Sequence, residues 1–312
     1  ISLGLVGSEM CIRDRERVEQ LKGVIALSVT PFTDDGEIDE EALRENIRYL
    51  IEAGADVLVP NGSCGECYAL TIEEQKRVIK IAVDEANGKV PVYAGASHSG
   101  TKVAIELSKY AEDVGADGVQ IIPPYYFMAD VVKHYSEISN AINIGIIVYN
   151  NPEVVTKPIT PQTLLEMTDK AENIVGVKDC TGNLAMVNET IKLIGDRVAI
   201  LCGTGESLAP FFYLLGSPGT YSSIINFAPK FPIEMNKAAM RGDYKTMMEI
   251  HSRLTPLLNF ISKHGPFIRV IKGAMEIVGR GAGPVRAPLT PLTEGEREEL
   301  RGILEDLGLL NE

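Results

Sequence analysis

Two patterns of apolar and polar positions alternate along the chain from Gly23 onward. Short, continuous apolar runs are typical of strands that are buried on both faces of a parallel sheet. Longer segments with apolar residues at helical spacing, such as Ile47, Leu50 and Ile51, follow each run. The strands are predicted at residues 23–32, 55–62, 90–96, 118–124, 144–151, 174–180, 198–203 and 219–226. The helices are predicted at residues 39–54, 71–88, 101–116, 130–142, 160–171, 184–195, 206–217 and 229–242.

Eight strand–helix units at intervals of roughly 25–35 residues predict an α/β fold, a (β/α)8 TIM barrel. A doubly wound open sheet is the alternative, but the first strand–helix turn, "VTPFTDDG", lacks the glycine fingerprint of that fold. The strand pattern stops near Arg241, and helical segments follow at residues 244–263, 266–279 and 293–308. We therefore predict a TIM barrel catalytic domain over residues 16–241 and a C-terminal helical extension over residues 242–312.

The first residues, "ISLGLVGSEMCIRDR", differ in character from the rest of the chain. Their basic residues follow the apolar part, whereas a secretory signal has them in front of it. The string "LVGSEMCIRD" matches the in-frame translation of a transposase sequencing adapter. We interpret residues 1–15 as a non-native leader and leave them out of the fold prediction, with a genuine N-terminal tail as the alternative.

Composition and charge narrow the class of protein. The 312 residues are 45% hydrophobic, enough for a large core, and carry a formal net charge of −13. An acidic chain argues against a nucleic-acid partner, which requires a basic surface. No apolar run is long enough to span a membrane. We therefore expect a cytoplasmic enzyme that acts on a small molecule, with no nucleic-acid or membrane partner.

Cys64 and Cys67 form a Cys-x-x-Cys pair in "NGSCGECYAL", a spacing found in redox dithiols and in zinc sites. A zinc site requires a second ligand pair. The four histidines lie in other segments, at His98, His134, His251 and His264. A redox dithiol sits at a helix start, whereas the next predicted helix begins near Thr71. We therefore predict no metal site at this pair. With Cys11, Cys180 and Cys202 the chain has an odd number of cysteines, so no disulfide framework is predicted either.

Lys178 is the candidate for the central chemistry, because it is the only lysine inside the eight predicted strands. Active sites of TIM barrels lie at the carboxyl ends of the strands, where Lys178 follows the apolar run "NIVGV". Burial there lowers the pKa of a lysine, and the neutral amine attacks ketones to form Schiff bases. The alternative is a structural ion pair with Asp179 or Glu66.

Tyr149 ends the preceding strand, and adjacent parallel strands lie about 4.8 Å apart. Its phenol is therefore placed to move protons to and from a carbinolamine on Lys178. The alternative for Tyr149 alone is an aromatic cap on the core.

The motifs "GSCGE", "PPYYF", "YNNP", "GVKDCTGN" and "VRAPL" together resemble the dihydrodipicolinate synthase / N-acetylneuraminate lyase superfamily. The resemblance runs from about Leu21 to Leu309. It implies a class I lyase, an aldolase or dehydratase, that binds pyruvate or a longer 2-keto acid as a Schiff base. It also implies that no metal or organic cofactor is needed.

The resemblance assigns roles to matching positions of this sequence. Lys178 matches the Schiff-base lysine and Tyr149 the proton-relay tyrosine. Ser63 matches the hydroxyl residue that links Tyr149 to a second tyrosine. That second tyrosine matches Tyr126, which in the family comes from a neighbouring subunit. The resemblance therefore implies a homo-oligomer, commonly a dimer of dimers.

Backbone N–H groups of the loop at Ser63, Cys64 and Gly65 would bind the carboxylate of the 2-keto acid, as glycine-rich turns do. Gly203, with Gly205, matches the glycine turn after the seventh strand. Tyr221 in the eighth strand is expected either to trim the substrate pocket or to belong to the core.

Two positions depart from the family pattern. Val154 stands where dihydrodipicolinate synthases have the arginine that helps to bind the carboxylate of the aldehyde substrate. Cys64 stands where the family has threonine, and a thiol is the poorer hydrogen-bond donor. We therefore predict a lyase that acts on pyruvate or a 2-keto-3-deoxy sugar acid. The alternatives are 4-hydroxy-tetrahydrodipicolinate synthase, which Val154 disfavours, and a non-catalytic keto-acid-binding barrel.

Overall fold

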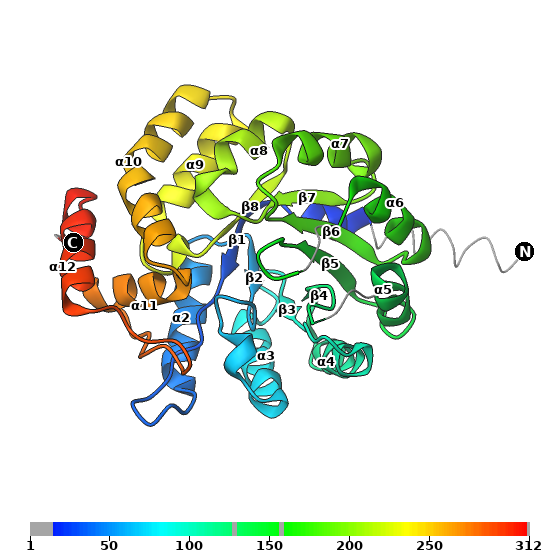
Figure 1. The fold of residues 1–312 in the computed structure, drawn as a ribbon, viewed down its shortest axis with the longest axis horizontal. Coiled ribbons are helices and arrows are strands. Elements are labelled where there is room, and N and C mark those ends of the chain that lie inside the picture. The colour runs from blue at the N-terminus through cyan, green and yellow to red at the C-terminus, as the bar shows by residue number, and fades with distance from the viewer. Residues whose placement is uncertain (1–14, 127–129, 156–158, 311–312) are drawn as a thin grey trace, which may run out of the picture.

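The computed structural model describes residues 15–126, 130–155 and 159–310, and it is a TIM barrel (Figure 1). Its strands are β1 (Gly23–Leu27), β2 (Val57–Val59), β3 (Tyr93–Gly95), β4 (Gly118–Ile121), β5 (Gly145–Asn150), β6 (Ile174–Asp179), β7 (Ala199–Cys202) and β8 (Gly219–Ser222). All paired strands are parallel, in the order β2-β1-β8-β7-β6-β5-β4-β3. A parallel bridge between Leu58 and Val92 joins the two ends of this sheet. The closure confirms the predicted barrel and excludes the open doubly wound sheet.

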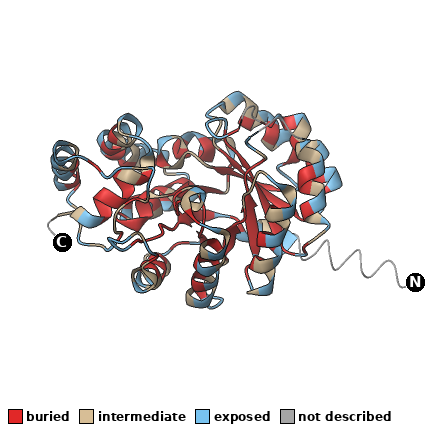
Figure 2. Ribbon diagram, turned by 60° about the horizontal axis from the view of Figure 1, so that its bottom comes forward, coloured by how far each residue is buried: buried red, intermediate tan, exposed pale blue. Residues whose placement is uncertain are grey.

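Helices alternate with the strands and cover the outside of the barrel (Figure 1). They are α2 (Glu40–Glu52), α3 (Ile72–Ala86), α4 (Thr101–Asp113), α5 (Val131–Ser139), α6 (Pro161–Lys170), α7 (Leu184–Ile194), α8 (Ala209–Leu215) and α9 (Lys230–Met240). Side-chain caps start several of them, and α3 begins with the capping box of Thr71 and Glu74. The strands and the inner faces of the helices are buried (Figure 2). The burial explains why the strands have continuous apolar sequences.

The helix predicted over residues 206–217 differs from the structure. A 3-10 turn, η2 (Gly205–Ser207), comes first, and α8 begins only at Ala209. Gly205 has a φ of +64°, a conformation that ends regular structure, and Pro210 fits only the first turn of a helix. Further 3-10 turns follow β2 and β8, at η1 (Cys67–Ala69) and η3 (Ile224–Asn226).

The C-terminal helices α10 (Tyr244–Lys263), α11 (Phe267–Ile277) and α12 (Glu294–Asp306) pack on one side of the barrel (Figure 1). α10 contacts α9, and the segment after α11 is joined to α2 by a hydrogen bond from Asn46 to the Gly281 carbonyl. We propose the division at residue 241, because α9 ends at Met240 and α10 begins at Tyr244.

Two expectations concern the chain ends and membranes. The predicted leader, residues 1–15, lies outside the described residues except for Arg15. Within the described ranges, no helix is both long enough and apolar enough to cross a bilayer.

Candidate active site

Lys178 lies near the carboxyl end of β6 and is the only lysine in the described strands. Only 2% of its surface is exposed. Its Nζ atom lies 3.8 Å from the ring centre of Tyr149 and 4.4 Å from that of Tyr221. Burial lowers the pKa of the Lys178 amine below its ordinary value of 10.5. Lys178 is therefore a lysine whose neutral, nucleophilic form is favoured.

The carboxylates that could have paired with Lys178 are bound elsewhere. Glu66 forms an ion pair with Lys272, with 2.7 Å between Oε1 and Nζ. Asp179 accepts hydrogen bonds from the backbone N–H and the hydroxyl of Thr181, at 2.9 and 2.7 Å. Among the described residues, no carboxylate forms an ion pair with Lys178. The structural pairing considered for Lys178 is thereby excluded within the described chain.

Tyr149 pairs with Lys178 in the register of β5 and β6, as the sequence predicts. Its hydroxyl accepts a hydrogen bond from the Asn151 side-chain amide at 3.1 Å. The side chains of Ser63 and Cys180 lie close enough to this hydroxyl to influence its pKa. Burial raises the pKa of Tyr149 well above 10. The phenol therefore keeps its proton and can donate it to a group on Lys178.

Ser63, Cys64 and Gly65 form the turn that leaves β2. The Gly65 carbonyl accepts a hydrogen bond from Thr30 Oγ1 at 2.7 Å, and an added Cβ at Gly65 would lie 3.1 Å from that atom. Burial raises the pKa of the Cys64 thiol to about 12 and that of Cys67 to about 11. Both cysteines are free thiols. Their raised pKa values do not suit a reactive redox dithiol.

Gly203 follows β7 beside Lys178. A Cβ at Gly203 would lie 2.8 Å from Lys178 Cγ and 2.9 Å from the Asp179 carbonyl oxygen, and it would overlap Cys180 Sγ. Only glycine leaves room here for the lysine side chain. The structure therefore explains why position 203 is a glycine, independently of the family resemblance.

Tyr221 is fully buried, and burial raises its pKa well above 10. Because its ring lies against the Lys178 amine, Tyr221 is both part of the core and a wall of the site. Tyr126 differs from these buried side chains, since 74% of its surface is exposed in the single chain. The structure therefore brings together Lys178, Tyr149 and Tyr221, with Ser63 at the Tyr149 hydroxyl.

Sequence reasoning missed three residues near this site. Cys180 lies close enough to Tyr149 and Lys178 to influence the pKa of both. Its signal is the two-residue spacing from Lys178, which places both side chains on one face of the strand. Glu206 is buried, burial raises its pKa to about 7, and it accepts a hydrogen bond from Ser222 Oγ at 2.5 Å. Lys272 reaches Glu66 from α11, and no local pattern predicts this contact.

No group of three or more histidine, cysteine or acidic side chains that could hold a metal ion occurs within the described ranges. Val154 lies in the turn after β5 with 38% of its surface exposed. The site as described consists of one lysine, phenols, hydroxyls, thiols and backbone groups, which are suited to Schiff-base and proton-transfer chemistry.

Comparisons with known proteins place this barrel in a family. The 4-hydroxy-tetrahydrodipicolinate synthase of Methanopyrus kandleri is 41% identical over 297 residues, which are 94% of this chain and 98% of that protein. The enzyme of the same name from Methanocaldococcus jannaschii is 38% identical, and the match covers 93% of this chain and 99% of that protein.

Solved structures agree. A crystal structure of a dihydrodipicolinate synthase has a TM-score of 0.87 at 38% identity, covering 93% of this chain and 100% of the other. YagE of Escherichia coli K12, solved in complex with pyruvate, has a TM-score of 0.88 at 31% identity, covering 93% and 99%. Residues 20–307 match the model of the Dihydrodipicolinate synthetase family. The chain therefore belongs to the dihydrodipicolinate synthetase family of lyases.

Proposed function

We propose that this lyase forms a Schiff base between Lys178 and pyruvate and joins the resulting enamine to an aldehyde. The observation that carries the proposal is the environment of Lys178. Its amine is buried, has a lowered pKa and lies 3.8 Å from the Tyr149 ring centre. The pyruvate bound to YagE, at 31% identity, supports the choice of keto acid.

In this mechanism the neutral Lys178 amine attacks the ketone carbon of pyruvate to form a carbinolamine. Tyr149 donates a proton to the departing hydroxyl, and water leaves as the iminium forms. The Tyr149 phenolate then takes a proton from the methyl group, which gives the enamine, and passes it to the aldehyde oxygen as the enamine carbon attacks the aldehyde. Addition of water to the new iminium releases the product and returns the Lys178 amine. No organic cofactor takes part in these steps.

The remaining site residues bind the substrate carboxylate or transfer protons. We assign carboxylate binding to the turn of Ser63, Cys64 and Gly65, because backbone N–H groups in such turns donate hydrogen bonds to anions. Ser63 lies close enough to Tyr149 to influence the pKa of its phenol, and we assign it the next position in the proton path. The raised pKa of Cys64 keeps its thiol neutral, so the backbone bears most of the carboxylate binding.

For the second substrate, the curated relatives favour the reading that the sequence alone disfavoured. Both methanogen relatives, which match nearly the whole chain, are 4-hydroxy-tetrahydrodipicolinate synthases. We therefore propose aspartate semialdehyde as the aldehyde. One observation favours a second candidate, a 2-keto-3-deoxy sugar acid. Val154, 38% exposed beyond β5, supplies no cation to an aldehyde that carries a carboxylate.

We also propose that the enzyme works as a homo-oligomer. Tyr126 is 74% exposed, and Tyr68 and Tyr125 are 55% and 41% exposed. Exposed large aromatic side chains are enriched at protein interfaces. In such an assembly Tyr126 of one copy would approach the Ser63 and Tyr149 pair of another.

Borohydride trapping tests the Schiff base. Pyruvate and borohydride should leave a stable adduct on Lys178, located by peptide mass spectrometry. The adduct should be absent in Lys178→Ala and present in Lys230→Ala, which removes an exposed lysine. No adduct with pyruvate or any of several longer 2-keto acids would overturn the proposal. An adduct without turnover of any second substrate would support the non-catalytic alternative.

The second substrate is decided by a turnover panel that sets aspartate semialdehyde beside several 2-keto-3-deoxy sugar acids. We expect turnover of the semialdehyde. Val154→Arg serves as the matched variant, and it should lower the KM for the semialdehyde while leaving pyruvate trapping unchanged. Turnover of a sugar acid alone would favour the second candidate.

A further inference from the structure

The turn proposed to bind the carboxylate lies between two residues in an unfavourable backbone conformation. Asn61 has a φ of +56° and Glu66 a φ of +54°. For residues other than glycine this left-handed region is unfavourable, and it persists where side chains hold it in place. Asn61 is held, because its amide donates hydrogen bonds to the Gly95 carbonyl at 2.7 Å and to Gln75 Oε1 at 3.1 Å.

Glu66 is held from the other side of the chain. It is completely buried, and Lys272 on α11 approaches its Oε1 to 2.7 Å. The second oxygen, Oε2, accepts a hydrogen bond from the backbone N–H of Arg286 at 2.9 Å. A buried carboxyl group without partners would be strongly destabilised, so these two contacts stabilise the Glu66 side chain in the turn.

Lys272 has little freedom to move. Its Nζ also donates a hydrogen bond to the Pro284 carbonyl at 2.9 Å and lies 4.3 Å from the ring centre of Phe32. Only 2% of its surface is exposed. The Cys64 thiol is close enough that the charges of both Lys272 and Lys178 lower its pKa, against the larger effect of burial. Lys272 therefore stands behind the turn whose other face borders the reactive lysine.

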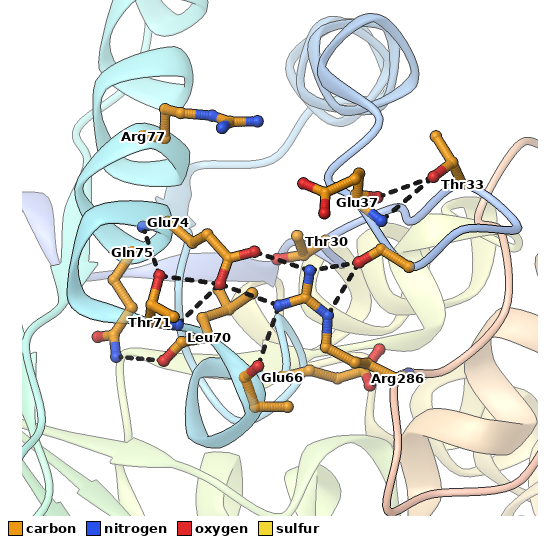
Figure 3. Close-up of polar contacts among 12 residues, drawn as sticks. Thr30, Thr33, Glu37, Glu66, Leu70, Thr71, Glu74, Gln75, Arg77 and Arg286 are labelled. Carbon is orange, nitrogen blue, oxygen red and sulfur yellow. Dashed lines mark hydrogen bonds and ion pairs between the residues drawn. The ribbon is translucent and has the colours of Figure 1, made fainter.

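Arg286 extends the same support to the start of α3 (Figure 3). Its guanidinium forms a bidentate pair with Glu74, at 2.8 and 3.0 Å, and donates to the Ala69 carbonyl at 3.0 Å. Arg286 holds the pKa of Glu74 low, at about 2, so this pair is charged at neutral pH. The chain between Glu66 and Glu74 is thus fastened at both ends by residues that follow α10.

We propose that Lys272 is a positioning residue for the keto-acid carboxylate, acting through Glu66. Its ammonium fixes the Glu66 side chain, Glu66 fixes the left-handed turn, and the turn aims the N–H groups of Cys64 and Gly65. This inference rests on the proposed function. It predicts that the affinity for the keto acid depends on the ion pair between Lys272 on α11 and Glu66 in the turn after β2, although neither side chain reacts.

The test measures the pyruvate concentration that gives half-maximal borohydride trapping, together with the adduct yield at saturation and the Tm. Lys272→Met keeps the length of the side chain and removes its charge. We expect the half-saturating concentration to rise at least tenfold, because the N–H donors lose their alignment. The yield at saturating pyruvate should remain close to that of the wild type, since Lys178 and Tyr149 are intact.

Leu304→Ala is the control for stability. Leu304 is a fully buried residue of α12, and its truncation lowers the Tm through lost packing without touching the turn. Its half-saturating concentration should stay within twofold of the wild type. Glu66→Gln is the second variant, and it decides the question alone if Lys272→Met does not fold. It removes the ion pair while keeping the size of the side chain, and should also raise the half-saturating concentration.

If Lys272→Met and Glu66→Gln fold and their half-saturating pyruvate concentrations equal that of the wild type, the positioning role of Lys272 is overturned. A normal adduct in the wild type would leave the proposed function standing. A wild type that forms no adduct with any 2-keto acid would overturn the proposed function, and this inference with it.

Discussion

Lys178 and Lys272 are buried to the same extent, each with 2% of its surface exposed. Burial lowers the pKa of both amines. They differ in their partners. Lys272 has the Glu66 carboxylate at 2.7 Å and a carbonyl oxygen at 2.9 Å. Lys178 faces two tyrosine rings and, among the described residues, pairs with no carboxylate.

The difference separates a lysine that is held in an ion pair from one whose amine is free to react, as we propose for Lys178. A carboxylate partner stabilises the ammonium form and opposes the effect of burial, as Glu66 does for Lys272. Aromatic faces attract a cation more weakly and leave the lone pair of a neutral amine accessible to a carbonyl carbon. Buried lysines in such barrels are thus distinguished by their counter-charges, and each prediction below removes or alters one side of this comparison.

The largest expected effect comes from the lysine without a carboxylate. Lys178→Met should abolish the borohydride adduct with pyruvate and lower turnover by on the order of 10³-fold or more, because no other amine can form the iminium. Mass spectrometry and a turnover assay measure the two effects. An adduct that persists at another lysine in this variant would contradict the assignment.

The paired lysine should matter most for stability. Lys272→Met leaves the Glu66 carboxylate buried without its cation, a change that costs about 3–5 kcal/mol in other proteins. Urea unfolding should show this loss, whereas Lys178→Met should show no comparable loss. Equal destabilisation by both substitutions would remove the distinction between the two lysines.

This pair also shows how far the sequence can lead. The barrel could be predicted because strands buried on both faces are continuous apolar runs. Lys178 could be found because it interrupts such a run. Lys272 could not, since a lysine in a helix is usually a surface residue. Its role depends on contacts over long separations, such as the hydrogen bond between Arg286 and Glu66, 220 residues apart.

Other parts of the site show the same limit. Ser63 and Tyr126 could be named only through the family resemblance, because isolated hydroxyl residues carry no periodic signal. The glycine at 203 gave a turn signal, but its reason is the neighbouring Lys178 side chain, which only the fold brings beside it. For the second substrate, the curated relatives favour the alternative over the reading that Val154 suggested, because similarity along the whole chain carries more information than one position.

Gly203→Ala disturbs Lys178 and leaves Lys272 untouched. The new methyl group would lie 2.8 Å from Lys178 Cγ, so the lysine side chain must shift. A displacement of about 1 Å can cost 10²-fold in rate, and we expect a loss of this order in adduct formation at saturating pyruvate. Gly302→Ala is the control, because a Cβ at Gly302 meets no neighbouring atom. A normal trapping rate in Gly203→Ala would show that the site tolerates the shift.

The smallest effect concerns the pH dependence of stability. The pKa of Lys178 is lower in the folded chain than its ordinary value of 10.5. Between these two values the unfolded chain binds more protons, so raising the pH through this range stabilises the wild type. Lys178→Met carries no such penalty. It should therefore unfold at a higher Tm than the wild type at pH 7, and the difference should shrink as the pH approaches 10.5.

Calorimetry of both proteins over this pH range checks the prediction, and other titrating groups cancel in the difference between them. A Tm difference that does not change with pH would show that Lys178 carries its charge in the folded chain as readily as in the unfolded one. Lys178 and Lys272 would then differ only in which groups surround them, because burial would no longer favour the neutral amine at Lys178. If the Tm difference between Lys178→Met and the wild type narrows as the pH rises, the buried Lys178 amine lowers the stability of the wild type at neutral pH, because no carboxylate balances its charge.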